Sequence, residues 1–156
     1  MIIKAFAGGL SQVLLIPATL LAIGMSATAA VAQRNLYNPI PLPASNEVTD
    51  TLSQKDIPTG QDGFARDYKI KLYAGQNVAI DLTSESFDTI LTLLAPDGST
   101  VAENDDGPDG TSNSLLFTRI KQTGTYIIRV RSFGETGGGP FKLKVTRLLP
   151  LKSNLK

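Results

Sequence analysis

Residues 68–82 read YKIKLYAGQNVAIDL, and this stretch decides the fold class. Apolar side chains alternate with polar ones on both sides of a turn sequence at residues 74–77. A period of two residues is typical of a β-strand that has one face in the core and one in water. The stretch therefore predicts two antiparallel strands joined by a tight turn. The side chains predicted to face the core are Tyr68, Ile70, Leu72, Val78, Ile80 and Leu82.

Five further segments have strand character, at residues 88–95, 99–103, 114–120, 126–130 and 141–145. Turn sequences such as Pro96-Asp97-Gly98 separate them. Short strands with frequent turns favour two antiparallel sheets packed face to face. We therefore predict an all-β antiparallel β-sandwich of about seven to eight strands.

The first 32 residues differ from the rest of the chain. Lys4 is their only charged residue, an apolar stretch covers 13–23, and small residues follow up to Ala32. This pattern predicts a signal peptide cleaved after Ala32, with Ala29 as a second site, and hence a secreted or periplasmic protein. The alternative is an uncleaved membrane anchor, because residues 13–32 are long enough to span a bilayer.

Residues 33–60 carry recurring prolines, including Pro39, Pro41 and Pro43. Alternate prolines exclude a helix and favour an extended chain. The sequence predicts a Pro-rich linker at 33–60, a β-sandwich domain at 61–148 and a C-terminal tail at 149–156.

The composition excludes several classes of function. The chain contains neither cysteine nor histidine, so disulfides, thiol catalysis, Ser-His-Asp triads and His-ligated zinc are excluded. Residues 33–156 carry 14 basic and 14 acidic residues, which argues against a general nucleic-acid binder. A hydrolase using Asp105 and Asp106 is disfavoured, because adjacent aspartates on one loop point in different directions. We predict that the protein is not an enzyme.

Charge is segregated along the chain. Residues 72–118 contain no basic residue, whereas residues 119–156 contain a single acidic one, Glu135. One interpretation is that solvated outer faces of strands carry these charges. The other is an anion-binding or self-association surface on one shared face of the last two strands, formed by Arg129, Arg131, Lys142 and Lys144.

An acidic loop contains the residues best suited to bind a cation. Asn104, Asp105, Asp106 and Asp109 offer oxygen ligands within a few residues, and Asp88 begins a strand that could approach the loop. Calcium takes six to eight oxygen ligands of these types. The alternative is a polar hairpin loop whose Asp and Asn side chains cap their own backbone. The spacing does not match an EF-hand, because Leu116 stands where Glu is required.

The ordered set of motifs over residues 62–148 resembles the bacterial pre-peptidase C-terminal domain, related to collagen-binding-type accessory modules of secreted proteases. The motifs, in chain order, are Asp67-Tyr68-Lys69-Ile70, Ala74-Gly75-Gln76, the run at 87–93, Pro96-Asp97-Gly98, Asn104-Asp105-Asp106, Gly124-Thr125-Tyr126 and Phe141-Lys142-Leu143. The resemblance implies a jelly-roll-like sandwich that is not catalytic and that in some members binds calcium. It would assign the calcium ligands to Asp88, Asn104, Asp105, Asp106 and Asp109.

These observations predict an exported, non-catalytic binding module, stabilised by calcium, that recognises an extracellular or envelope protein or a polysaccharide. A protease acting in trans is one such partner. The alternative is a structural or assembly protein of the cell envelope, and a hydrolase is the third hypothesis. No nucleic-acid partner is expected, and membrane contact is expected only if the N-terminal segment is uncleaved.

Overall fold

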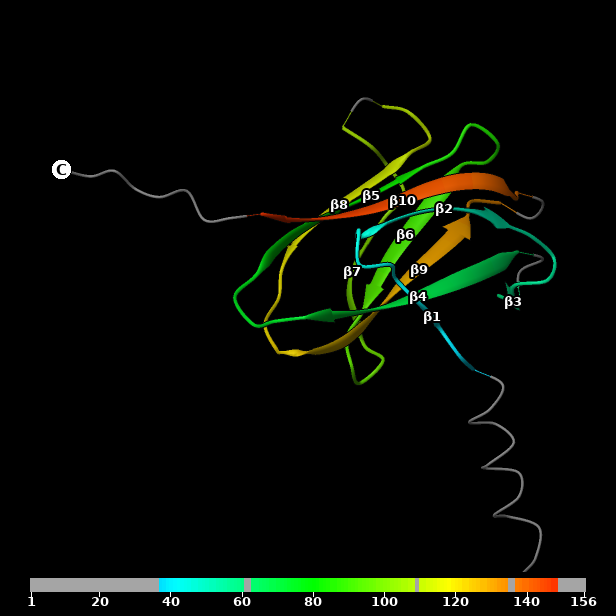
Figure 1. Ribbon diagram of the computed structural model, residues 1–156. Coiled ribbons are helices and arrows are strands. Elements are labelled where there is room, and N and C mark those ends of the chain that lie inside the picture. The colour runs from blue at the N-terminus through cyan, green and yellow to red at the C-terminus, as the bar shows by residue number, and fades with distance from the viewer. Residues whose placement is uncertain (1–36, 61–62, 109, 135–136, 149–156) are drawn as a thin grey trace, which may run out of the picture. The chain divides into compact units, whose positions relative to one another are not determined.

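The computed structural model describes residues 37–60, 63–108, 110–134 and 137–148 (Figure 1). The predicted signal peptide, the predicted C-terminal tail and Asp109 lie outside these residues. The chain divides into two units, Met1–Asn38 and Pro39–Lys156, and the second contains the strands. Within the described residues no helix is long and apolar enough to cross a membrane.

The described part of the chain forms ten strands in two sheets. Sheet A has the order β1-β4-β9-β6-β7, with the short β3 also paired to β4, and sheet B has the order β2-β10-β5-β8. All pairings are antiparallel except that of β1 with β4. The strands are β1 (Ile40–Pro41), β2 (Glu47–Leu52), β3 (Ile57–Pro58), β4 (Phe64–Leu72), β5 (Asn77–Thr83), β6 (Thr89–Leu94), β7 (Thr100–Asn104), β8 (Ser114–Arg119), β9 (Gly124–Ser132) and β10 (Gly139–Leu148).

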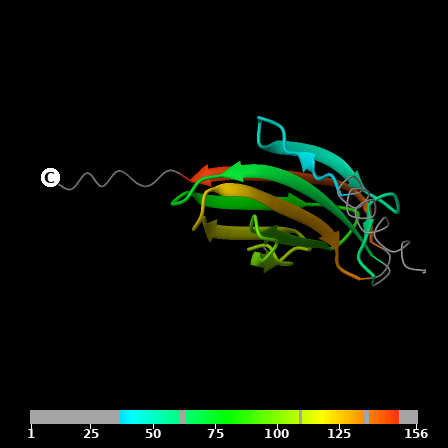
Figure 2. The ribbon, with the colours of Figure 1, turned by 90° about the horizontal axis from the view of Figure 1, so that it is seen from below.

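The predicted all-β sandwich is confirmed. In Figure 1 sheet B lies above sheet A, and Figure 2 looks onto sheet A from below. Each of the seven predicted strand segments coincides with one of the strands β4–β10. Strands that alternate apolar and polar residues bury one face each, and the two buried faces form one core. Its fully buried members include Tyr68, Leu72, Val78, Ile80, Leu82, Leu91, Leu93, Ile128, Val130 and Leu143.

The predicted linker at 33–60 is wrong for its described part. Residues 40–58 contribute β1, β2 and β3, and Leu52 at the end of β2 is only 1% exposed. The prolines do not prevent this, because Pro41 and Pro58 lie in two-residue strands at the edge of sheet A. Edge positions tolerate proline, since the missing N–H removes no bond inside the sheet.

The packing of Gly124 explains why glycine begins the Gly124-Thr125-Tyr126 motif. A Cβ atom added to Gly124 would collide with the ring of Pro96. The turn between β6 and β7 therefore packs directly against the start of β9. Gly98 completes the turn with a φ of 85°, a conformation that glycine adopts at little cost, and its N–H donates to the Ala95 carbonyl at 2.9 Å.

Candidate functional site

The acidic loop is held close to the edge of sheet B. The Asn104 side-chain amide donates to the carbonyls of Asp106 and Leu115, at 2.7 Å each. The Leu115 N–H in turn donates to the Asp106 carbonyl at 3.1 Å. These bonds cover part of the free edge of β8 with the loop. They are the backbone-capping bonds expected of the polar-loop alternative.

The structure describes four of the five predicted calcium ligands, Asp88, Asn104, Asp105 and Asp106, but not Asp109. No group of three acidic side chains that could hold a metal ion occurs among the residues that the structure describes. Asp88 lies one residue before β6, and its carbonyl accepts the Phe133 N–H at 2.7 Å. Calcium takes six to eight oxygen ligands, which include amide and backbone carbonyl oxygens as well as carboxylates. The calcium prediction includes Asp109, which is not described, and it stays a prediction.

The prediction that four basic residues share one face is wrong. Arg129 and Arg131 lie on β9 in sheet A, whereas Lys142 and Lys144 lie on β10 in sheet B. In each strand these residues alternate with buried core residues, so the two pairs face outward on opposite sides of the sandwich. The sequence shows that each pair faces away from the core, but it does not show that the two strands belong to different sheets.

Three of these four residues are also paired with carboxylates. Arg129 makes two bonds of 2.8 Å to Asp67, which is 3% exposed. The outer pairs are Arg131 with Glu103 and Lys142 with Glu47, both at 2.8 Å. Pairing of this kind offsets part of the positive charge of each outer face, while Lys144 on β10 and Lys69 on β4 make no ion pair within the described residues.

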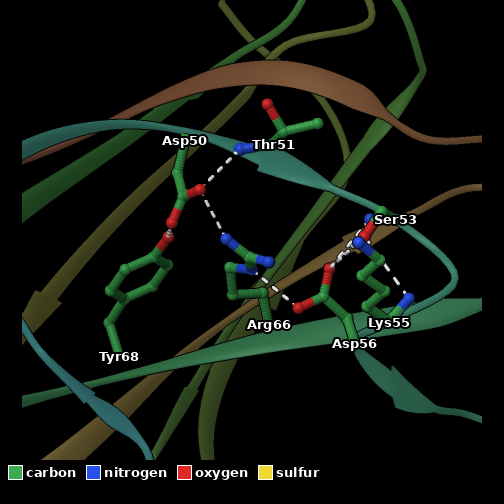
Figure 3. Close-up of polar contacts among 7 residues, drawn as sticks. All are labelled: Asp50, Thr51, Ser53, Lys55, Asp56, Arg66 and Tyr68. Atoms are coloured by element: carbon green, nitrogen blue, oxygen red, sulfur yellow. Dashed lines mark hydrogen bonds and ion pairs between the residues drawn. The ribbon is translucent and has the colours of Figure 1, made fainter.

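A polar cluster that sequence reasoning missed lies between the two sheets, centred on Arg66 (Figure 3). Arg66 is on β4 and faces inward with Tyr68. It binds Asp50 of β2, and its Nε donates to Asp56 Oδ1 at 2.7 Å. The Tyr68 hydroxyl donates to Asp50 Oδ2 at 2.7 Å. The cluster therefore ties β2 of sheet B to β4 of sheet A.

The local sequence holds both carboxylates in place. Asp50 also accepts the Thr51 N–H at 2.8 Å. Asp56 accepts the Ser53 N–H at 2.8 Å, and its own N–H donates to the Ser53 carbonyl at 3.0 Å, so residues 53–56 form a closed turn. The Tyr68 ring packs edge-on against Phe141 at a centroid distance of 6.3 Å. The polar cluster therefore continues directly into the core.

The environment shifts the pKa values of the cluster in opposite directions. Partial burial raises the pKa of Asp50, but hydrogen bonds from Tyr68, the Thr51 amide and Arg66 outweigh it and hold the pKa below the ordinary 3.8. Burial and the neighbouring Asp50 carboxylate raise the pKa of Tyr68 above its ordinary range. Burial lowers the pKa of Arg66, and the bonds to Asp56 and Asp50 raise it above its ordinary value. At neutral pH Asp50 is ionised, Tyr68 is neutral and Arg66 is charged.

A signal for this cluster was present in the sequence. Extending the alternation of Tyr68, Ile70 and Leu72 backwards places Arg66 on the core face. A guanidinium between two sheets requires an anionic partner. Asp50 stands between Val48 and Leu52 with the same period of two, and it is that partner.

An open groove of about 390 Å³ crosses β10 at one end of sheet B. Its lining is rich in hydroxyl groups, with one carboxylate and one amide. Among the described residues, the side chains of Thr49, Thr83, Glu85 and Ser86 have no hydrogen-bond or ion-pair partner. The groove is lined by Thr49, Thr83, Ser84, Glu85, Ser86, Asn113, Pro140 and Phe141.

Bonds within the loops fix the walls of this groove. Asn113 Oδ1 accepts the Ser84 N–H at 3.0 Å, and the Ser84 hydroxyl donates to the Pro140 carbonyl at 2.9 Å. The same hydroxyl accepts the Ser86 N–H at 3.0 Å. Ser84 therefore holds the wall in place, while the neighbouring groups remain available to a ligand.

Comparison with known proteins agrees with this architecture. Residues 65–132 match the family model of the bacterial pre-peptidase C-terminal domain. One similar solved structure is the pre-peptidase C-terminal domain of a collagenase from Bacillus anthracis, with a TM-score of 0.52 at 14% identity; the match covers 70% of this chain and 93% of that one. Another is a periplasmic inhibitor of g-type lysozyme from Aeromonas hydrophila, with a TM-score of 0.51 at 16% identity over 71% of this chain and 96% of that one. No curated protein matches the sequence at a significant level.

The fold and the family match agree on a β-sandwich similar to the bacterial pre-peptidase C-terminal domain. The resemblance to the bacterial pre-peptidase C-terminal domain that the ordered sequence motifs predicted is confirmed by the family-model match over residues 65–132. The matched segment begins one residue after the first residue of β4 and ends with β9. Strands β1–β3 and β10 complete the sandwich outside that segment.

Proposed function

We propose that this protein is an exported, non-catalytic binding module that holds an extracellular or envelope polysaccharide in the groove over β10. The observation that carries the proposal is the set of unpaired polar groups in that groove, from Thr49, Thr83, Glu85 and Ser86. Sugar hydroxyl groups both donate and accept hydrogen bonds, and the hydroxyl and carboxylate side chains of the groove match them. The open form of the groove suits a chain that lies across it rather than a small enclosed ligand.

Three further observations support an exported module. The N-terminal sequence has the pattern of a signal peptide. The absence of cysteine and histidine removes the commonest catalytic groups. The family match is to a domain type named for its place behind peptidases, and one of the similar structures is described as periplasmic.

Sedimentation with insoluble cell-envelope material tests the proposal. The protein should pellet with envelope polysaccharide, and it should still do so after the envelope proteins have been digested by a protease. A Thr49→Ala/Thr83→Ala variant should bind at least about tenfold more weakly, because each lost hydrogen bond leaves a sugar hydroxyl unpaired. A matched Thr100→Ala/Thr125→Ala variant changes two exposed threonines outside the groove and should bind like the wild type.

Two results would contradict the polysaccharide assignment. Loss of binding after protease digestion would identify a protein ligand instead. Equal binding by the groove variant and its control would remove the groove from the interaction.

The calcium prediction has a separate test in thermal unfolding. If the acidic loop holds calcium in the native state, the midpoint should rise by several degrees between chelator and millimolar calcium, by mass action. Asp105→Ala should abolish the rise. An unchanged midpoint in the wild type would leave the loop as a solvated turn.

A further inference from the structure

The two ends of the sandwich carry opposite charge, although the sequence after residue 32 has no net charge. At one end β4 joins β5 and β8 joins β9; this end lies at the left of Figure 1. We call it the basic end, because the exposed ionic side chains that the structure describes there are Lys71, Arg119, Lys121 and Arg147, with one acid, Asp97. At the opposite end β5 joins β6 and β7 joins β8. We call it the acidic end, because its exposed ionic side chains in the described residues are Glu85, Asp88, Asp105 and Asp106, with one base, Lys55.

Backbone bonds make each end a fixed surface. At the basic end the Gly75 N–H donates to the Ile120 carbonyl, and the Ile120 N–H donates to the Gln76 carbonyl, both at 2.8 Å. These bonds hold Arg119 and Lys121 beside the turn that follows Lys71. At the acidic end the Thr89 N–H donates to the Ser112 carbonyl at 2.9 Å. This bond brings the two acidic connections together.

The charge segregation along the sequence explains this polarity. Residues 72–118 contain no basic residue, and they supply the β5–β6 and β7–β8 connections. The basic end draws on residues 119–148 and on β4. In the middle of the strands the charges are largely paired, as for Arg131 with Glu103 and Lys142 with Glu47. Among the described residues, the charges that make no ion pair therefore lie mostly at the ends, with Lys69, Asp81 and Lys144 between them.

The distance between the two ends determines whether their charges interact with each other within one molecule. Strands β4 and β9 have nine residues each, which gives a separation of roughly 30 Å. Charges in physiological salt interact over only about 8 Å. The two ends are therefore independent patches, and each meets a partner through its own charge.

We propose that the basic end of one copy of this protein docks on the acidic end of the next. The chain itself carries a complementary surface for each end, so a second copy satisfies both at once. A two-fold dimer through either end would instead set like charges against each other. Head-to-tail contact between different surfaces does not close on itself, so the product is a linear array rather than a dimer. This contact is independent of the polysaccharide groove, and it specifies how an envelope-assembly role would operate.

Analytical ultracentrifugation tests the contact. The protein is expressed from its full coding sequence in a bacterial host and purified in the form that the cell releases. At about 20 mM salt the average mass should rise with concentration beyond that of a dimer. Between about 20 mM and 300 mM salt the apparent dissociation constant should rise at least about tenfold, because exposed charges are screened.

Charge-reversed variants make the test specific to the ends. Arg119→Glu/Lys121→Glu gives a molecule with two acidic ends, and Asp105→Lys/Asp106→Lys gives one with two basic ends. Each should remain monomeric by itself at low salt. An equimolar mixture should form one-to-one pairs, because each variant keeps one native end. Lys142→Glu/Lys144→Glu, a control with the same change in net charge as the first variant, lies mid-strand and should associate like the wild type.

Several outcomes would overturn the proposal. A wild type that stays monomeric at low salt and high concentration would do so, as would association that salt does not weaken. A closed dimer, or variants that associate like the wild type, would also contradict it. Loss of association in the mid-strand control would show that the change in net charge, rather than the charge of the ends, prevents association. A monomer whose basic end binds an anionic polymer would identify a different partner and refute self-association.

Discussion

The N-terminal strands β1–β3 and the strands after residue 63 are stabilised within the sandwich by different kinds of contact. Strands β4, β5, β6, β8, β9 and β10 bury apolar side chains, which make up most of the described core, and β7 adds the partly buried Ala102. Strand β2 has a backbone ladder with β10 but contributes only one fully buried side chain, Leu52, and the partly buried Val48. Its third inward side chain, Asp50, binds Arg66 and Tyr68. A strand whose inward face includes a charged residue is therefore hard to predict from apolar alternation in the sequence, even when it is part of the sheet.

The largest effect should come from Arg66→Met, which removes the centre of the polar cluster. Two carboxylates then remain partly buried without their cation, and loss of one partner of such a group costs about 2–4 kcal/mol of stability. Denaturant unfolding measures this loss, and proteolysis near residues 47–58 should increase. Lys142→Met removes one cation from an exposed pair and should leave stability within experimental error. Equal effects of the two substitutions would show that the Arg66 cluster is no stronger than a surface pair.

Tyr68→Phe should have the next largest effect, because it removes one hydroxyl and keeps the ring. The lost bond goes to an ionised carboxylate, so the expected cost is about 1.5–3 kcal/mol. The measurement is the free energy of unfolding as a function of pH.

The pH dependence of the wild type follows from the two pKa shifts. The lowered pKa of Asp50 contributes stability above the ordinary value of 3.8, which is lost as the pH falls through the folded-state pKa. The raised pKa of Tyr68 contributes stability below its ordinary value of 10.0, which is lost as the pH rises toward the folded-state pKa. Tyr68→Phe should abolish the alkaline loss and reduce the acid loss. An unchanged pH profile in Tyr68→Phe would show that the Tyr68 hydroxyl does not contribute to the pKa shift of Asp50.

The smallest effects should come from two buried serines at the acidic end, and they should have opposite signs. The Ser114 hydroxyl lies 2.6 Å from the Thr89 hydroxyl and donates to the Thr89 carbonyl at 2.9 Å, so Ser114→Ala should cost about 1 kcal/mol. The Ser132 hydroxyl is buried, and it has no hydrogen-bond partner among the residues that the structure describes. Ser132→Ala should be neutral or stabilise the protein by up to about 1 kcal/mol. Destabilisation by Ser132→Ala comparable to that of Ser114→Ala would indicate a bond that the structure does not contain.

Most of the fold could be predicted from the sequence, because period-two alternation and turn chemistry act locally. The strands from β4 to β10 follow directly from residues such as Tyr68, Ile70 and Leu72. Strand β2 could not be found this way, because Asp50 interrupts its apolar face and the prolines on either side indicate an extended linker. Its partner Arg66 is 16 positions further along the chain, and only the topology brings the two together.

The candidate site was predicted less well than the fold. Alternation correctly placed Arg129, Arg131, Lys142 and Lys144 on outward faces. It could not show that β9 and β10, consecutive in the chain, belong to different sheets. The groove is formed by residues from β2, β5, β10 and two loops, so no local sequence pattern predicts it. The calcium ligands stay a prediction from the residue types and the family resemblance.

Amide hydrogen exchange at residues 47–52 tests most directly whether the N-terminal segment belongs to the domain. The ladder between β2 and β10, with Val48 opposite Leu143, predicts slow exchange at the bonded amides of β2, comparable to that of the edge strand β8. Exchange of the whole segment at the rate of an unstructured chain would contradict this account, and it would restore the interpretation of residues 33–60 as a linker.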